Sequence, residues 1–198
     1  YGMFTGGFGL HYGLQKLGCM MIPAGSGNTE RHIAMIEDYG TTVLVATPSY
    51  ALHGCEVGEK MGYDWAKSPL RVGLFGGEPC PPGLKAEIED RMHIVCTDNY
   101  GLTEVMGPGV SGECLASRDM QHLAEDHFLW EVVDPETGDP VPDGEMGELV
   151  LTPLGKQAIP VLRYRTHDLT RVVTEPCACG RTTARMQKVR ARSDDMLI

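Results

Sequence analysis

Basic side chains and long hydrophobic runs are both scarce in this sequence. The 198 residues carry 17 lysines and arginines against 27 aspartates and glutamates, so the net charge is −10. Long-range repulsion would oppose each encounter with nucleic acid or an anionic membrane, and we expect neither as a partner. The apolar runs, such as residues 43–46, are far shorter than the roughly 20 residues that a membrane helix needs.

An export signal is lacking as well. The chain begins at Tyr1 without a basic region or a cleavable apolar segment, which predicts that it is part of a longer protein. Seven cysteines are an odd number, and without an export signal they indicate a reducing, cytoplasmic compartment where thiols are buried or bound to metal. Apolar residues at 42% and charged residues at 22% are close to globular averages, which excludes wholesale disorder.

The first half alternates strand-like and helix-like stretches. Strands are predicted at 19–23, 42–46, 70–75 and 93–96, and helices at 29–39, 50–61 and 82–92. Alternation with short connections predicts parallel strands covered by helices, with ligands at the carboxyl ends of the strands.

After about Gly107 the helix signals nearly vanish. Strands are predicted at 128–133, 148–152, 161–165 and 169–174, with a tight turn at 134–140 that is rich in Pro, Gly and Asp. We therefore predict an α/β fold, in which a parallel sheet with flanking helices (1–108) is followed by a β-rich subdomain (109–193).

The stretch 97–104 gathers groups that suit a nucleotide. Tyr100 can stack on a purine, Gly101 lets the backbone approach a phosphate, Thr103 can donate to a phosphate oxygen, and Glu104 can hold a magnesium ion. For this stretch alone, a turn with a core tyrosine and a solvated glutamate is an equal alternative.

Further motifs follow in a fixed order. They are Gly-Glu-Leu-Val-Leu-Thr at 147–152, Tyr-Arg-Thr-His-Asp at 164–168 and Arg-Ser-Asp-Asp at 192–195. With 100–104 they resemble the acyl-adenylate-forming ligase superfamily. Phe-Thr-Gly-Gly at 4–7, Asn-Thr-Glu-Arg at 28–31 and Gly-Gly-Glu-Pro at 76–79 narrow the resemblance to the phenylacetate-CoA ligase family, and it covers essentially the whole chain.

The resemblance implies a two-step reaction. A carboxylate attacks the α-phosphate of ATP to give an acyl-adenylate, and the thiol of coenzyme A then displaces AMP. By matching positions, Tyr100 is implied to stack on adenine, Thr103 to contact the α-phosphate, Glu104 to hold Mg²⁺ and Asp168 to accept the ribose hydroxyls, while Arg192 contacts the ribose or phosphate. For Asp168, hydrogen bonding within a turn is the alternative.

The resemblance also implies roles for neighbouring residues and for a hinge. Asn99 and Gly101 lie next to the nucleotide, and Asp194 corresponds to a hinge, with 194–198 leading to a carboxyl-terminal domain that the chain lacks. Ala191 stands where the family usually has glycine. A phosphate loop and a lysine-bearing carboxyl-terminal domain are also missing from these residues, so we expect this chain alone to be inactive.

The resemblance places the acid substrate near one group of residues, Tyr1, Phe4, Gly6, Gly76, Gly77 and Glu78. Small residues leave room for a flat ring there. The alternative is a strand-ending turn at 76–77 and a core position for Phe4. Cys80 stands where the family often has a large aromatic, which predicts a wider pocket and an aromatic acid in general.

Cys177 and Cys179 form a short knuckle with a glycine, in which two thiolates can face one ion. Cys114 and His122 complete a Cys3His set for a structural, tetrahedral zinc ion, with His127 as a reserve ligand. The alternatives are four unrelated side chains or a transient disulfide.

The leading hypothesis is therefore a cytoplasmic, ATP-dependent aryl-acid CoA ligase, with ATP, coenzyme A and a small acid as partners and a homodimer as one option for its assembly. Two rivals stay open: a synthetase that adenylates a deazaflavin coenzyme, and a non-catalytic, zinc-stabilised binding module. A dinucleotide-binding site is disfavoured. The sequence has Gly25-Ser26-Gly27 after a predicted strand, but it lacks the third glycine and the acidic residue of that motif.

Overall fold

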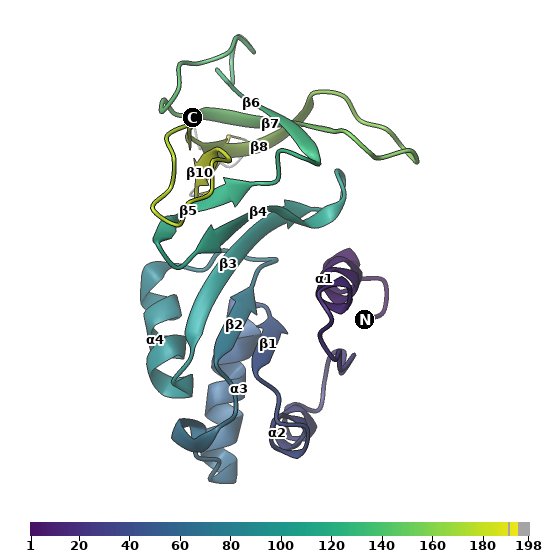
Figure 1. Ribbon diagram of the computed structural model, residues 1–198, viewed down its shortest axis with the longest axis vertical. Helices are drawn as coiled ribbons and strands as arrows, with labels where there is room; N and C mark the ends of the chain where they lie inside the picture. Colours follow the sequence, from purple (N-terminus) through teal and green to yellow (C-terminus); the bar gives the residue numbers. More distant parts are fainter. Residues whose placement is uncertain (190, 194–198) are drawn as a thin grey trace. The chain divides into compact units, whose positions relative to one another are not determined.

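A computed structural model describes residues 1–189 and 191–193. The chain divides into two compact units between Asp98 and Asn99 (Figure 1). The domain boundary near residue 108 stays a prediction for the protein as a whole.

The first unit is an α/β structure. Its elements are α1 (Thr5–Lys16), α2 (Thr29–Asp38), β1 (Val43–Ala46), α3 (Pro48–Met61), the short 3-10 helix η1 (Trp65–Lys67), β2 (Val72–Phe75), α4 (Pro82–Met92) and the first half of β3 (Val95–Leu102). β1 pairs with β2 and β2 with β3, both in parallel, with Val43 opposite Val72 and Val72 opposite Val95. The predicted parallel sheet is confirmed.

Local sequence signals explain where the helices of this unit begin and end. Asn28 caps α2 by accepting a hydrogen bond from the backbone N–H of Arg31, at 3.1 Å. Thr47 caps α3, Pro48 is its first residue, and Gly62 follows its end in the left-handed region, with φ of 74°.

Two segments differ from the sequence-based expectations. Residues 19–23 form no strand, because Pro23 has no N–H to donate and the segment pairs with no neighbouring strand of the described chain. Helix α1 was not predicted, since four glycines weaken its helical signal.

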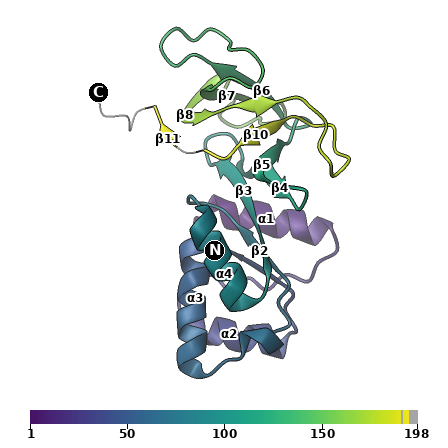
Figure 2. The same ribbon diagram turned by 90° about the vertical axis from the view of Figure 1, so that its left-hand side faces the viewer.

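Helices α3 and α4 lie side by side on one face of the parallel strands (Figures 1 and 2). The core between helices and strands is mainly apolar and includes Ile33 of α2, Cys55 of α3, Ile88 of α4 and Phe75 of β2, all at most 2% exposed. This packing fixes the carboxyl ends of β1 and β2.

Strand β3 continues beyond the predicted end at residue 96 into the second unit. There it pairs antiparallel with β4, with Tyr100 opposite Ser111. Tyr100 and Gly101 therefore belong to a strand, whereas the sequence reading placed them in the loop that follows one.

The second unit is built from antiparallel strands. They are β4 (Gly107–Cys114), β5 (Ser117–Leu123), β6 (Phe128–Val133), β7 (Gly147–Pro153), β8 (Tyr164–Thr170), β9 (Val172–Val173), β10 (Arg185–Gln187) and β11 (Ala191–Arg192). One sheet has the order β3-β4-β5-β10-β9, and a second has the order β11-β8-β7-β6. The predicted β-rich second half is confirmed, although β4 and β5 were missed because their polar and glycine-rich residues lack an apolar pattern.

A buried cluster holds this unit together, with Val110, Leu149, Leu151 and Met186 completely buried. The turn between β6 and β7 is specified locally, because Asp134 accepts hydrogen bonds from the backbone N–H groups of Glu136 and Thr137.

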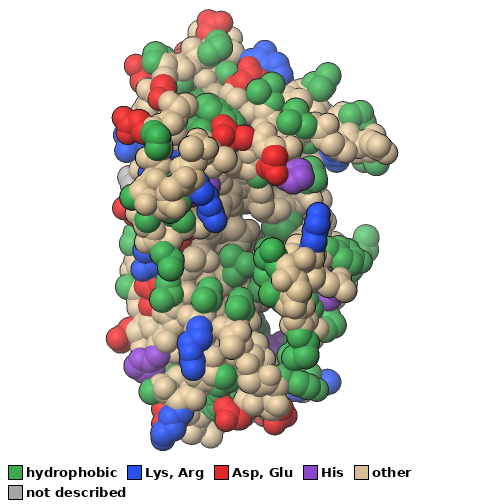
Figure 3. Space-filling model, viewed as in Figure 1, with side chains coloured by type: hydrophobic (Ala, Val, Ile, Leu, Met, Phe, Trp, Pro, Cys, Tyr) green, Lys and Arg blue, Asp and Glu red, His purple; other side chains and the backbone are tan. Residues whose placement is uncertain are grey.

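Apolar side chains are also exposed. Figure 3 shows them on the surface where α1 lies, and the exposed residues there include Phe4, Phe8 and Tyr12. Among the described residues no helix combines the length and the hydrophobicity that crossing a membrane requires.

Candidate functional site

The motif at residues 100–104 begins where the pairing of β3 with β4 changes register. The register of β3 against β4 shifts between Tyr100 and Gly101. A Cβ on Gly101 would lie 2.1 Å from the carbonyl oxygen of Gly107 and 2.6 Å from the Cα of Pro108. Only glycine lets the two strands approach this closely, so it fixes where Tyr100 stands.

Tyr100 contacts the motif at residues 164–168 directly. Its hydroxyl donates a hydrogen bond to the carboxylate of Asp168, which lies on β8. Thr166 positions Asp168: its hydroxyl donates to the carbonyl of Leu149 at 2.8 Å and accepts from the backbone N–H of Asp168 at 3.1 Å. Two motifs that are 68 residues apart in the chain thus share one hydrogen bond.

The charges around this contact come from several strands. Burial raises the pKa of Tyr100, and the negative charge of Asp168 raises it further, while the guanidinium of Arg192 opposes both effects. Burial also raises the pKa of Tyr164, and Glu104 and Asp168 add to that increase. Arg192 of β11 is paired in register with Asp168, and the charges of both residues act on Tyr100 and on Tyr164.

Thr103 and Glu104 lie in the exposed turn between β3 and β4. The ammonium of Lys156 donates a hydrogen bond to the backbone carbonyl of Glu104. The structure therefore brings Tyr100, Glu104, Asp168 and Arg192 together, with Thr103 next to Glu104 in the turn and Asn99 before Tyr100 on β3. Asp194, the expected hinge, lies outside the described residues.

The four predicted metal ligands also converge. The ligand atoms of Cys114, His122, Cys177 and Cys179 all lie within 4.8 Å of one another. Within the cluster, the sulfurs of Cys114 and Cys177 are 3.7 Å apart, and the sulfur of Cys179 lies 3.4 Å from Nε2 of His122. Three thiols and one imidazole from separate segments form a closed set of soft ligands.

Neighbouring groups hold these side chains in place. Nδ1 of His122 hydrogen-bonds the hydroxyl of Thr183 at 3.1 Å, which turns Nε2 toward the sulfurs. Burial and the charge of Arg181 lower the pKa of His122 and so favour the neutral imidazole that binds metals. The backbone N–H of Cys179 lowers the pKa of the Cys177 thiol.

The knuckle itself is a tight turn. Gly180 has φ of 88°, and its N–H donates to the carbonyl of Cys177 at 2.9 Å. His127, the reserve ligand, is not in the cluster: its imidazole is 59% exposed and stands 3.6 Å from the carboxylate of Asp126.

The residues expected to contact the acid lie in the first unit. Phe4 and Gly77 are neighbours, since a Cβ on Gly77 would lie 3.8 Å from the Phe4 ring. The Tyr1 hydroxyl instead hydrogen-bonds His11, at 2.9 Å, and a Cβ on Gly6 would strike the Phe4 ring at 2.6 Å. Gly76 follows the carboxyl end of β2.

Glu78 has a structural partner. Its carboxylate accepts a hydrogen bond from the backbone N–H of Ser49 at 2.5 Å, in the first turn of α3. A carboxylate at this position complements the positive end of the helix dipole, so the role of Glu78 toward an acid stays a prediction.

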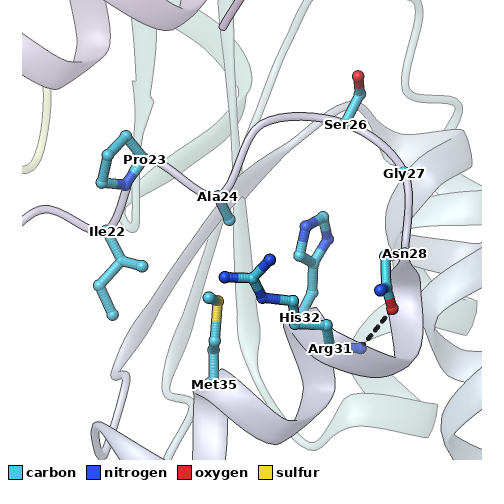
Figure 4. A pocket seen from close by; sticks show the side chains of 9 residues that line it. All are labelled: Ile22, Pro23, Ala24, Ser26, Gly27, Asn28, Arg31, His32 and Met35. Atoms are coloured by element: carbon cyan, nitrogen blue, oxygen red, sulfur yellow. Dashed lines mark hydrogen bonds between the residues drawn. The ribbon is translucent and has the colours of Figure 1, made fainter.

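A cavity of about 230 Å³ lies elsewhere in the first unit (Figure 4). The loop 22–28, which contains Gly25-Ser26-Gly27, forms one wall, and Arg31, His32 and Met35 of α2 form the other. The residues expected to bind the acid do not line it.

Comparison with known proteins decides the family. The family described as AMP-binding enzyme matches residues 3–154. The chain belongs to this family. Among curated relatives, this chain is 50% identical over 198 residues to a phenylacetate-coenzyme A ligase of Aromatoleum evansii and 48% identical over 199 residues to one of Escherichia coli (strain K12). The chain is covered completely in both comparisons but spans only 44% and 45% of the length of those relatives.

A solved structure supports the fold of this chain. An open conformation of 2-hydroxyisobutyryl-CoA ligase, in complex with 2-HIB-AMP and CoA, superposes with a TM-score of 0.93 at 27% identity. The comparison covers all of this chain and 44% of the other. The resemblance stated from the motifs is confirmed.

Sequence reasoning missed several residues that shape these sites. Thr166 lies inside the motif at 164–168, so its role in positioning Asp168 could have been predicted from the sequence. Lys156 and Thr183 are single polar residues in segments without a pattern, and their contacts arise only from the tertiary fold.

Proposed function

We propose that the natural protein containing this chain is an ATP-dependent ligase for an aromatic carboxylic acid such as phenylacetate. It would form an acyl-adenylate with release of pyrophosphate and then pass the acyl group to coenzyme A with release of AMP. Identity of 46–50% to four phenylacetate-coenzyme A ligases supports this reaction. The observation that carries it is the hydrogen bond that joins Tyr100 to Asp168.

Each residue of the site has a role in this reaction. Asp168 would accept the ribose hydroxyls, and Tyr100 would present its ring to the adenine. Thr103 would donate to the α-phosphate, and Arg192 would offset the negative charge that builds there. No covalent enzyme intermediate is needed, because the substrate carboxylate itself is the nucleophile.

Magnesium belongs to the proposal through Glu104. Mg²⁺ prefers oxygen ligands and usually keeps several waters and substrate phosphates in its shell. The exposed carboxylate of Glu104 in the turn fits this requirement. When bound, Mg²⁺ would neutralise phosphate charge.

Replacement of Asp168 tests the nucleotide site. In the natural full-length gene product, Asp168→Asn should weaken AMP binding at least about tenfold, because the acceptor for the ribose hydroxyls loses its charge. The matched control is Asp119→Asn, an exposed aspartate on β5, which should bind AMP like the wild type. Isothermal titration calorimetry measures both, and equal affinities for all three proteins would contradict the site.

The products distinguish the reaction from its rivals. Incubation with ATP, phenylacetate and coenzyme A should release pyrophosphate and AMP and form the acyl-CoA. Pyrophosphate release that depends on a deazaflavin coenzyme, without a thioester, would favour the adenylating synthetase. An absence of pyrophosphate release with any acid would favour the non-catalytic module.

We propose further that the Cys3His cluster holds a structural zinc ion. The four ligands leave no place for a substrate, which argues against a catalytic metal. The purified protein should contain about one zinc ion per chain. The Cys179→Ser variant should lose the zinc ion. The Cys19→Ser variant should keep it, because Cys19 is exposed and lies outside the cluster. A Cys179→Ser variant with full zinc content would refute the site.

The proposal includes a cytoplasmic location, since thiolate ligands persist in a reducing compartment.

A further inference from the structure

His167 stands in a backbone conformation that its side chain disfavours. Its φ is 62°, in the left-handed region that glycine adopts readily and other residues rarely. Residues with side chains persist there when the surrounding structure holds them in place. The contacts of His167 show what holds it.

One side of His167 is tied to a buried carboxylate. Its backbone N–H donates to Oε1 of Glu148 at 3.1 Å, and its Nδ1 lies 3.6 Å from the same oxygen. Glu148 is completely buried on β7 and also accepts hydrogen bonds from Arg165. This end of His167 is therefore anchored inside the second unit.

The other side of His167 is tied to the end of the described chain. Its carbonyl accepts a hydrogen bond from the backbone N–H of Ser193 at 2.7 Å, and its Nδ1 lies 3.3 Å from the Ser193 hydroxyl. Ser193 directly follows β11, in which the described residues Ala191 and Arg192 pair with Leu169 and Asp168 of β8. The contacts of His167 extend this short ladder by one residue.

We propose that His167 is a positioning residue that clamps β11 to β8 and thereby holds Arg192 beside Asp168 in the nucleotide site. The inference rests on the proposed function of that site. His167 needs no contact with the nucleotide, because it acts through Arg192. Ser193 directly follows Arg192, so the backbone and ring contacts of His167 to Ser193 hold Arg192 in register with Asp168.

A double-mutant cycle in the natural full-length gene product tests this role. His167→Gly suits the left-handed backbone, so thermal stability should be retained while AMP binds about tenfold more weakly, the loss expected when a charged contact is no longer held in place. In an Arg192→Ala background the same change should have no further effect on AMP affinity. His167→Asn, which tolerates the left-handed region and keeps a hydrogen-bonding side chain, should restore affinity to within about threefold of the wild type.

Other outcomes would overturn the proposal. Wild-type affinity in His167→Gly, or an equal loss in both backgrounds, means that His167 does not act through Arg192. His127→Asn changes an exposed histidine of the same unit and should bind AMP normally. If His167→Gly does not fold, Ser193→Ala takes its place, with a loss expected only when Arg192 is present. A wild-type protein that fails to bind AMP would instead refute the proposed function.

Discussion

Single glycines decide how closely strands can approach in this protein. Gly101 has no room for a methyl group, because the backbone of residues 107 and 108 occupies the space. Glycine is required at position 101 for steric reasons and not because of a positive φ. It therefore differs from Gly180, whose φ of 88° only glycine adopts readily.

Replacement of Gly101 should be costly. We expect Gly101→Ala to lower the free energy of unfolding by about 1–3 kcal/mol, because backbone atoms cannot move aside as a side chain would. Urea denaturation measures this change. Gly112→Ala is the matched control on β4, since nothing lies within 4 Å of its added Cβ, and it should change stability by less than about 0.5 kcal/mol. Equal stability of the two variants would show that β3 and β4 can separate freely.

The residue types at the candidate site could be predicted from sequence, but their contacts could not. Tyr100, Asp168 and the four metal ligands each belonged to a recognisable pattern. Which of their atoms meet depends on strand register, and the shift at Tyr100 leaves no mark in the sequence beyond one glycine. The partner of Glu78, the N–H of Ser49, was likewise hidden because the two lie 29 residues apart.

At the scale of elements, an ion pair joins β7 to β8 between the buried carboxylate of Glu148 and the partly exposed Arg165. Burial raises the pKa of Glu148, but the hydrogen bonds from Arg165 and from the His167 N–H lower it more, so it lies below its ordinary value of 4.5. A carboxylate with a lowered pKa binds fewer protons in the folded state than in the unfolded state. It therefore stabilises the fold above pH 4.5, and this stabilisation is lost as the pH falls below that value.

The variant Glu148→Gln should show how much the ionised carboxylate of Glu148 contributes to the free energy of unfolding. At pH 7 we expect a loss of roughly 2 kcal/mol, at the low end for a buried pair because Arg165 is 44% exposed and screened by water. Between pH 5 and pH 3, estimated from the carboxylate range, its stability should fall less steeply than that of the wild type. Urea denaturation across this range measures both effects. Glu145→Gln, at an exposed position on the loop before β7, should follow the wild type, and parallel curves for all three proteins would argue against the role of Glu148.

Elements with a regular apolar pattern were predictable, and those without one were not. Helix α4 and strand β6 match their predicted bounds, because Leu84 and Ile88 repeat at helical spacing and 128–133 is rich in large apolar residues. Strands β4 and β5 hold together through their pairing, and each carries one residue of the Cys3His cluster. Pairing of this kind is a property of the fold and is invisible in either strand alone.

At the scale of the whole molecule, the two units should respond differently to metal removal. The proposed zinc ligands all lie in the second unit, so chelation should speed amide hydrogen exchange in β4, β5 and β10 by about tenfold or more while β1 and β2 keep their protection. Mass spectrometry of the exchanged peptides measures this pattern. The same chelator should leave a His122→Ala/Cys179→Ser variant unchanged, and a uniform increase across both units would point to a general effect of the chelator.

The division of the chain inside β3 matters for anyone who wishes to dissect the protein. A cut after Asp98 would sever one strand between its parallel partner and its antiparallel partner. Each product would then end in a half-strand, residues 95–98 paired with β2 or residues 99–102 paired with β4, and residues at a new chain terminus are often poorly ordered. Limited proteolysis or gene truncation should therefore spare Val95 to Leu102 as a unit, so that the nucleotide motif keeps the strand that carries it.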